Sequence, residues 1–214
     1  MTPILYSFRR CPYAMRARLA IAAAAAPVEL REVVLRNKPA AFLAASDSGT
    51  VPCLVTEDGA INESLDIMKW ALARNDPDHW LDMSEAGWDL IARADGPFKE
   101  ALDRTKYATR YPDIDTQEQR LLAAAFLTDL DATITDWIFD HPTIADFAIL
   151  PFVRQFAFID KAWFDAQPWP SLQQWLGRFL GSGSFEGIMQ KYPQWVQGDA
   201  ATYFASQTPI FYPT

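Results

Sequence analysis

Apolar and polar positions change period twice along the first part of the chain. Residues 4–8 form a short apolar run, and residues 28–35 interleave apolar with charged side chains, as strands do. Between them, residues 15–25 are rich in alanine and other good helix formers, so they predict a helix that can pack closely on a sheet. This stretch therefore predicts a βαβ unit.

A second group of elements follows directly. Residues 38–45 predict a short helical turn, and residues 53–56 predict a strand. Asp58-Gly59 favours a tight hairpin turn into a brief return strand at residues 60–61. Residues 63–74 then carry apolar side chains at helical spacing, which completes a ββα unit.

Beyond about residue 80 the pattern is helical, with no convincing strand. Helices are expected over residues 85–107, 116–139, 144–158 and 171–180. The stretch between the two halves has the Asn, Asp and Pro of a linker. The sequence predicts an α/β domain at residues 1–76, a linker at 77–84 and an all-helical domain at 85–214.

Composition narrows the possible partners. The chain has 214 residues, of which 50% are apolar, so a sizeable core can form. Its net charge of −8 argues against a nucleic-acid partner, and no apolar run approaches the roughly 18 residues of a membrane span.

Arg9-Arg10 before the apolar residues 19–26 loosely imitate a twin-arginine export signal, but the run is short and mostly alanine. Two cysteines are too few for a secreted disulfide scaffold, so a cytoplasmic protein is expected.

Cys11 is the first candidate for chemistry. It lies between a predicted strand and a predicted helix, where free N–H groups and the helix dipole favour a thiolate. Arg9, Arg10 and Arg16 can add positive potential, and Pro12 suits a first helical turn. The alternative is a buried structural cysteine. The strand–Cys–Pro–helix context favours the reactive thiol.

This thiol would act alone. A redox motif with two cysteines would have its second thiol at residue 14, which is Ala14. Cys11 would therefore form a mixed disulfide that a small external thiol resolves. Cys53 follows Pro52 within a strand and is interpreted as a small core residue.

Three further segments have the chemistry to hold a peptide-like ligand. The Val51-Pro52 bond could be cis, which would turn the backbone of Val51 toward a ligand that pairs in strand fashion. Ser64 starts a helix, where N–H groups attract a carboxylate, and Glu63 beside it can accept hydrogen bonds from an ammonium group. Lys38 is available for a second carboxylate. The alternatives are an ordinary helix cap and a solvated lysine.

Together these segments resemble the glutathione transferase family over nearly the whole chain. "CPYAMRARL" is similar to the active-site helix of its cysteine-containing, omega-like branch, and "RNKPAAF", "GTVPCLV" and "INESLDIMKWAL" are similar to that branch's glutathione-binding segments. The resemblance implies a thioredoxin-like N-terminal domain and an all-α C-terminal domain. "HPTIADFAILPFVRQF", with Thr143 three residues before Asp146, resembles the capping box of the family's central helix, which is a folding element.

The resemblance also implies roles for single residues. Cys11 would be the catalytic thiol, and glutathione would be the cosubstrate, with no metal. His79 and His141 lie far apart and suggest no zinc site. The implied glutathione-binding residues are Tyr13 near the thiol, Lys38 at the glycine carboxylate, Val51 and Pro52 at the backbone, and Glu63 and Ser64 at the γ-glutamyl head.

The expected activity is thiol transfer, reductive deglutathionylation or a dehydroascorbate reductase-like reaction, in a detoxification setting. The second substrate would be a small electrophile or disulfide, and the resemblance implies a homodimer. Two alternatives stay open: an ordinary conjugating transferase, and a non-catalytic binding protein of the stringent-starvation type. Trp88, Phe98, Lys99 and Tyr107 are candidates for the second substrate's pocket, and Gly96-Pro97 is expected to interrupt the helix there.

Overall fold

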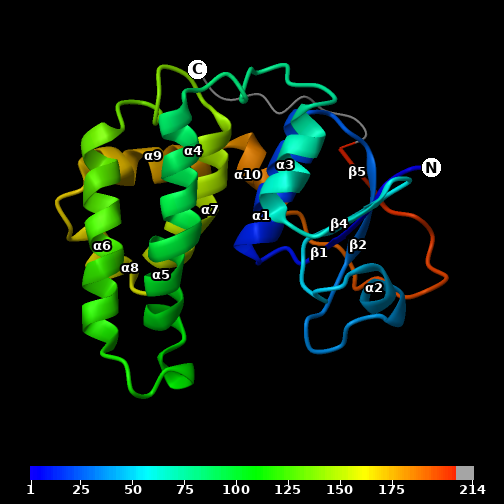
Figure 1. Cartoon of the computed structure of the whole chain (residues 1–214), viewed down its shortest axis with the longest axis horizontal. Helices are drawn as coiled ribbons and strands as arrows, with labels where there is room; N and C mark the ends of the chain where they lie inside the picture. Colours follow the sequence, from blue (N-terminus) through cyan, green and yellow to red (C-terminus); the bar gives the residue numbers. More distant parts are fainter. Residues whose placement is uncertain (206–214) are drawn as a thin grey trace. The chain divides into compact units, whose positions relative to one another are not determined.

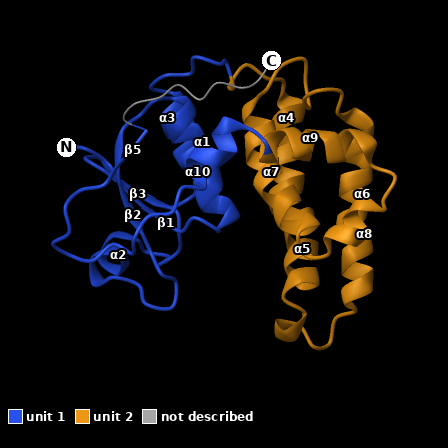
Figure 2. Cartoon of the chain, turned by 180° about the vertical axis from the view of Figure 1, so that it is seen from behind, with its two compact units in different colours: residues 1–79, 181–214 blue, residues 80–180 orange. Residues whose placement is uncertain are grey.

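The computed structural model describes residues 1–205. It divides into two compact units, one made of Met1–His79 with the chain from Gly181 onward, and one made of Trp80–Leu180 (Figure 2). The sequence had predicted one helical domain from residue 85 to residue 214. The structure instead groups the chain after residue 180 with the α/β unit, because this segment pairs with that unit's sheet and packs in its core.

The first unit contains a five-stranded sheet in the order β4-β3-β1-β2-β5. Strand β1 is parallel to β2 and antiparallel to β3, so Leu5 lies opposite both Leu30 and Leu54. These leucines are buried, which fixes the register. The elements of this unit, seen in Figure 1, are β1 (Ile4–Ser7), α1 (Pro12–Ala23), β2 (Val28–Glu32), α2 (Ala40–Ala45), β3 (Cys53–Thr56), β4 (Gly59–Ile61), α3 (Ser64–Leu72), α10 (Gly183–Ile188) and β5 (Tyr203–Phe204).

Strand β5 corrects the expectation that no strand follows residue 80. Its two residues pair antiparallel with β2, with Phe204 opposite Val28. Upstream of it, the side chain of Trp195 joins a core cluster with Tyr6 and Phe42, which also includes residues of β3. A strand of two residues has no alternating pattern to detect, since it is specified by the edge that it covers rather than by its own sequence.

Helices α1 and α3 pack against each other, and α10 packs against α1. Helix α1 is buried almost all round, including Arg16 and Arg18, and its alanines allow this close packing. The opposite face of the sheet carries Tyr6, whose ring lies 5.1 Å from that of Phe42 in α2. The first turn of α1 and the ends of β1 and β3 therefore meet at one end of the sheet.

Residues 80–180, which form the second unit, contain helices joined by turns and loops and no strand. The helix predicted at 85–107 is interrupted, since Ala94–Phe98 forms a π-helical turn in which Gly96 has φ −91° and ψ −105°. The expected interruption at Gly96-Pro97 is therefore confirmed. The helices of this unit are α4 (Glu85–Arg93), α5 (Lys99–Lys106), α6 (Thr116–Thr133), α7 (Ile144–Ala157), α8 (Lys161–Asp165) and α9 (Pro170–Leu180), with a 3-10 turn at Ala108–Arg110. Within residues 1–205, no helix has the length and apolar character needed to cross a membrane.

The start of α7 is organised by the buried carboxylate of Asp146. It accepts hydrogen bonds from the backbone N–H and the hydroxyl of Thr143 at 2.9 and 3.1 Å, and from Ile138 N–H and Trp175 Nε1–H, both at 3.0 Å. Burial raises the pKa of Asp146, and these four hydrogen bonds oppose that shift. The predicted capping box is confirmed. Helix α6 ends at Thr133 and not at the predicted residue 139, and Ile138, beyond its end, donates its N–H to Asp146 instead of to a helical carbonyl.

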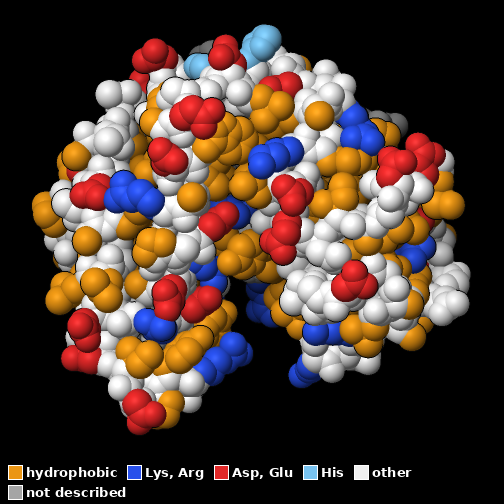
Figure 3. All heavy atoms as spheres, viewed as in Figure 1, with side chains coloured by type: hydrophobic (Ala, Val, Ile, Leu, Met, Phe, Trp, Pro, Cys, Tyr) orange, Lys and Arg blue, Asp and Glu red, His pale blue; other side chains and the backbone are white. Residues whose placement is uncertain are grey.

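The two units differ in charge. Residues 1–79 contain nine basic and nine acidic residues, whereas residues 80–180 contain nine basic and sixteen acidic ones. Acidic side chains are spread over the visible face of the helical unit (Figure 3). The net charge of −8 therefore belongs mainly to the second unit and does not describe the surroundings of Cys11.

Candidate functional site

Cys11 occupies the N-cap position of α1, with an extended backbone at φ −77° and ψ 124°. Its N–H donates to Phe8 O at 2.9 Å, which closes a tight turn between β1 and α1. No side-chain hydrogen bond caps this helix, and Pro12 occupies the first turn. The thiol is half-buried at a helix start whose free N–H groups and dipole favour negative charge.

The Val51-Pro52 segment lies beside this thiol. The Cys11 Sγ–H donates to Val51 O at 3.7 Å, although forty residues separate the two in the sequence. The Val51-Pro52 bond, which the sequence allowed to be cis, is cis. Cys53, the next residue, is fully buried in the core, and burial raises the pKa of its thiol. The structure thus brings Cys11 and Val51 together and keeps Cys53 as a core residue.

Ser64 is the first residue of α3 and is buried. Arg16 of α1 approaches it, with Nη1 3.5 Å from Ser64 Oγ, and the same guanidinium lies 5.8 Å from the centre of the Tyr13 ring. Tyr13 and Ser64 therefore share one neighbour. The sequence identified Arg16 only as a source of positive potential, because nothing in its spacing showed that α3 packs against α1.

Lys38 and Glu63 are exposed. Lys38 lies in the loop between β2 and α2, and Glu63 is the N-cap residue of α3, where its side chain makes no capping bond. Both charges are thus available to solvent, as groups that meet the charged ends of a ligand must be. The candidate site consists of a buried part around Cys11, Val51 and Ser64 and an exposed part formed by these two residues.

Two family models match the chain. One, described as glutathione S-transferase, N-terminal domain, matches residues 5–79, and the other, described as glutathione S-transferase, C-terminal domain, matches residues 89–178. The chain belongs to the glutathione S-transferase family.

Known relatives agree with this assignment. A probable glutathione transferase of Aplysia californica is 44% identical over 57 residues, which are 27% of this chain and 62% of the relative's length. Glutathione transferase Omega 3C of Trametes versicolor has the same fold, with a TM-score of 0.74, 17% identity, and coverage of 89% of this chain and 84% of that one. A Pseudomonas putida glutathione transferase, solved with one glutathione disulfide bound per subunit, has a TM-score of 0.73 and 17% identity over 88% and 91% of the two chains.

Sequence patterns did not predict one feature near the thiol of this glutathione S-transferase family member. Arg18 is fully buried and forms an ion pair with Glu32. Burial lowers the pKa of the Arg18 guanidinium. Glu32 also accepts the backbone N–H of Arg9 at 2.7 Å. The signal in the sequence was the charge of Glu32 inside a predicted strand, but its partners lie on other elements.

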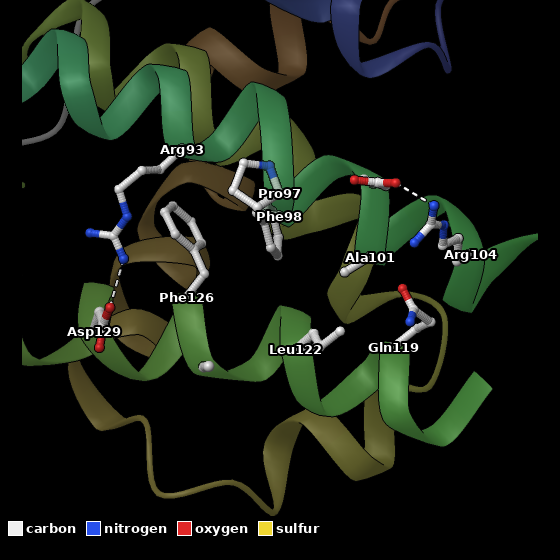
Figure 4. A pocket seen from close by; sticks show the side chains of 11 residues that line it. Arg93, Pro97, Phe98, Ala101, Arg104, Gln119, Leu122, Phe126 and Asp129 are labelled. Atoms are coloured by element: carbon white, nitrogen blue, oxygen red, sulfur yellow. Dashed lines mark hydrogen bonds and ion pairs between the residues drawn. The ribbon is translucent and has the colours of Figure 1, made fainter. Parts of the chain in front are cut away.

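The helical unit contains a pocket of about 310 Å³ between the α4–α5 segment and α6 (Figure 4). The rings of Phe98 and Phe126 stack in it with their centres 4.7 Å apart, and Arg93 pairs with Asp129 at its edge. Of the four aromatic and basic residues expected to line a second-substrate pocket, only Phe98 lines this one. Among residues 1–205, no group of three or more metal-ligating side chains lies together.

Proposed function

We propose that this family member is a glutathione-dependent thiol transferase of the omega-like type, with Cys11 as its nucleophile. The observation that carries the proposal is the half-buried Cys11 thiol at the uncapped start of α1, next to Val51-Pro52. Ala14, one helical turn after Cys11, is buried and carries no thiol. A single thiol in this position suits a cycle in which a second glutathione resolves the intermediate.

In this cycle the Cys11 thiolate attacks the glutathionyl sulfur of a mixed disulfide. A disulfide between Cys11 and glutathione forms, the substrate's own S–S bond breaks, and its thiolate leaves and takes a proton from water. A second glutathione thiolate then attacks the glutathionyl sulfur. Glutathione disulfide leaves, and the Cys11 thiolate is restored. Overall, the substrate sulfur is reduced to a thiol and one free glutathione thiol is oxidised, and it leaves as glutathione disulfide together with the glutathionyl group taken from the substrate.

The other predicted site residues would hold glutathione. The backbone of Val51 and Pro52 would pair with the tripeptide, and the start of α3 at Ser64 would receive the γ-glutamyl carboxylate. Glu63 would accept from the γ-glutamyl ammonium group, and Lys38 would meet the glycine carboxylate. Tyr13 would flank the thiol. The free state of both cysteines is compatible with a cytoplasmic location, and a homodimer with a small disulfide or electrophilic substrate completes the proposal.

The test combines a mass measurement with two assays. After incubation with glutathione disulfide, the protein should gain one glutathione at Cys11, and Cys11→Ser should gain none, whereas Cys53→Ser should behave like the wild type. The wild type should reduce a small glutathione mixed disulfide faster than it conjugates an aryl halide, and Cys11→Ser should lose the reduction.

Two results would overturn the proposal. Brisk conjugation without reduction or mass gain would mean that Cys11 only polarises bound glutathione, as in a conjugating transferase. A protein that is not retained on immobilised glutathione would be a binding protein on the same fold.

A further inference from the structure

Glu32, at the end of β2, is a buried carboxylate with a partner on each oxygen. Oε2 pairs with the Arg18 guanidinium of α1, and Oε1 accepts the backbone N–H of Arg9 at 2.7 Å. Arg18 also donates from Nε to Ser7 Oγ at 2.8 Å. The carboxylate thus joins strands β1 and β2, helix α1 and the loop that leads to Cys11.

The bond to Arg9 falls on the turn that presents the thiol. Because Cys11 N–H donates to Phe8 O, residues 8–11 form a four-residue turn in which Arg9 is the second residue. The N–H of that position points out of the turn and needs an acceptor elsewhere. Glu32 supplies the acceptor for the N–H of Arg9, which lies two residues before Cys11.

The same network reaches the C-terminal segment. Arg18 Nη1 donates to Ile188 O at 3.0 Å, and Arg9 Nη1 donates to Met189 O at 3.2 Å. These carbonyls lie at the end of α10, where a helix has C=O groups without partners of its own and attracts cations. The guanidinium groups of Arg9 and Arg18 are therefore held by consecutive carbonyls.

We propose that Glu32 is a positioning residue for Cys11, and that it acts by holding the Arg9 N–H so that the thiol stays at the start of α1. This inference rests on the proposed function, since it assigns Cys11 the reactive role. The charged and titratable groups around Glu32 are Arg9 from the loop, Arg18 from α1 and Tyr192 from the C-terminal segment. The ion pair with Arg18 balances the charge of the carboxylate, so its main effect on the thiol is geometric.

A geometric role and a purely electrostatic role of Glu32 predict different effects of two Glu32 variants on the stability of the Cys11 thiolate. Glu32→Gln removes the negative charge but keeps an oxygen that accepts from Arg9, whereas Glu32→Ala removes both. If Glu32 acted by charge alone, both variants would stabilise the Cys11 thiolate. If it acts by position, Glu32→Ala releases the thiol from the helix start and disfavours the thiolate.

The experiment measures the rate of Cys11 alkylation by iodoacetamide against pH in the full chain, in a Cys53→Ser background. We expect the midpoint of Glu32→Ala to rise toward the value of about 8.5 for a free cysteine, while Glu32→Gln stays at or below the wild type. Glu29→Ala is the matched control, since Glu29 forms an ion pair with Arg31 on the same strand and has no bond to the loop. It should keep the wild-type midpoint, even if both alanine variants unfold at lower temperature.

A second pair of variants covers the case in which Glu32→Ala does not fold. Arg9→Ala keeps the N–H that Glu32 accepts, and Arg9→Pro removes it while suiting the second position of a turn. The midpoint should be higher in Arg9→Pro than in Arg9→Ala. Equal midpoints in this pair, or shifts of Glu32→Ala and Glu32→Gln in the same direction, would overturn the inference. Alkylation needs no glutathione, so these results are separate from a failure of thiol transfer, which only the mass and reduction assays detect.

Discussion

Helices α1 and α7 begin in opposite ways. The N-cap residue of α7 is Thr143. The Asp146 carboxylate in the first turn accepts four hydrogen bonds from protein groups. Helix α1 starts with Cys11, whose side chain makes no capping bond. Both starts contain a group that can carry negative charge, and that of α7 accepts from four donors of the protein. A helix start that lacks such a cap has donors left for a thiolate or a ligand.

The nearby carboxylates continue this contrast. Asp146 accepts from the N-cap residue of its own helix, whereas Glu32 accepts from Arg9 in the loop before Cys11. We therefore interpret the α7 start as a folding element, whereas the α1 start is the site that we propose for chemistry. The contrast predicts that the two places respond to different measurements, stability for Asp146 and thiol reactivity for Cys11.

The largest expected difference is between the two cysteines. At pH 7 in the native protein, Cys11 should react with iodoacetamide at least about 100-fold faster than Cys53, because the Cys53 thiol is buried, has a raised pKa and reacts only when the structure opens. Mass spectrometry of peptides over time measures both rates in one sample. In denaturant the two rates should converge. Equal native rates would remove the distinction between a reactive and a core cysteine.

The next effect tests the α7 start. Asp146→Asn should lower the free energy of unfolding by about 2–4 kcal/mol, because an amide leaves two of the four buried donors facing an NH₂ group. Urea unfolding followed by tryptophan fluorescence measures it. Asp140→Asn, at an exposed position of the same connection, should change it by less than about 0.5 kcal/mol. If the folded Asp146→Asn protein lost Cys11 reactivity, the separation of the two helix starts would fail.

The smallest effects belong to the exposed part of the site. Lys38→Ala and Glu63→Ala should each weaken glutathione binding by about 1–2 kcal/mol, as expected for single hydrogen bonds to charged groups in contact with water. Titration calorimetry on the folded variants measures the change, and Lys191→Ala, also exposed and in the same unit, is the control. Unchanged affinity in both variants would assign the charged ends of glutathione to other residues.

Local sequence patterns predicted most of the first unit and the start of α7 in the second. The strand at 4–7, the helix that follows Cys11 and the capping box at Thr143 each depend on residues within one or two turns, so their signals are contiguous. The cis bond before Pro52, which the sequence left as a possibility at the entry of a strand, is present.

The missed features depend on contacts between distant residues. Strand β5 exists because β2 offers an open edge, and Trp195 is buried because Tyr6 and Phe42 leave space for it. The bond from Arg9 to Glu32 spans twenty-three residues, and those from Arg9 and Arg18 to the end of α10 span 180 and 170. The periodicity of a single sequence does not encode such pairs. The sequence therefore predicted where the Cys11 thiol lies but not the hydrogen bonds of the loop before it.

The first unit is built from two segments that are far apart in the sequence, and this has a consequence for its synthesis on the ribosome. Residues 80–180 form their unit from one uninterrupted segment, whereas the α/β unit needs both Met1–His79 and the chain from Gly181 onward. Although Met1–His79 emerges before the helical unit, the α/β unit is completed after it, because Trp195 and β5 leave the exit tunnel later than residues 80–180. Until then the Tyr6–Phe42 cluster and the β2 edge are uncovered, so a nascent chain that stalls before residue 195 presents these surfaces to chaperones.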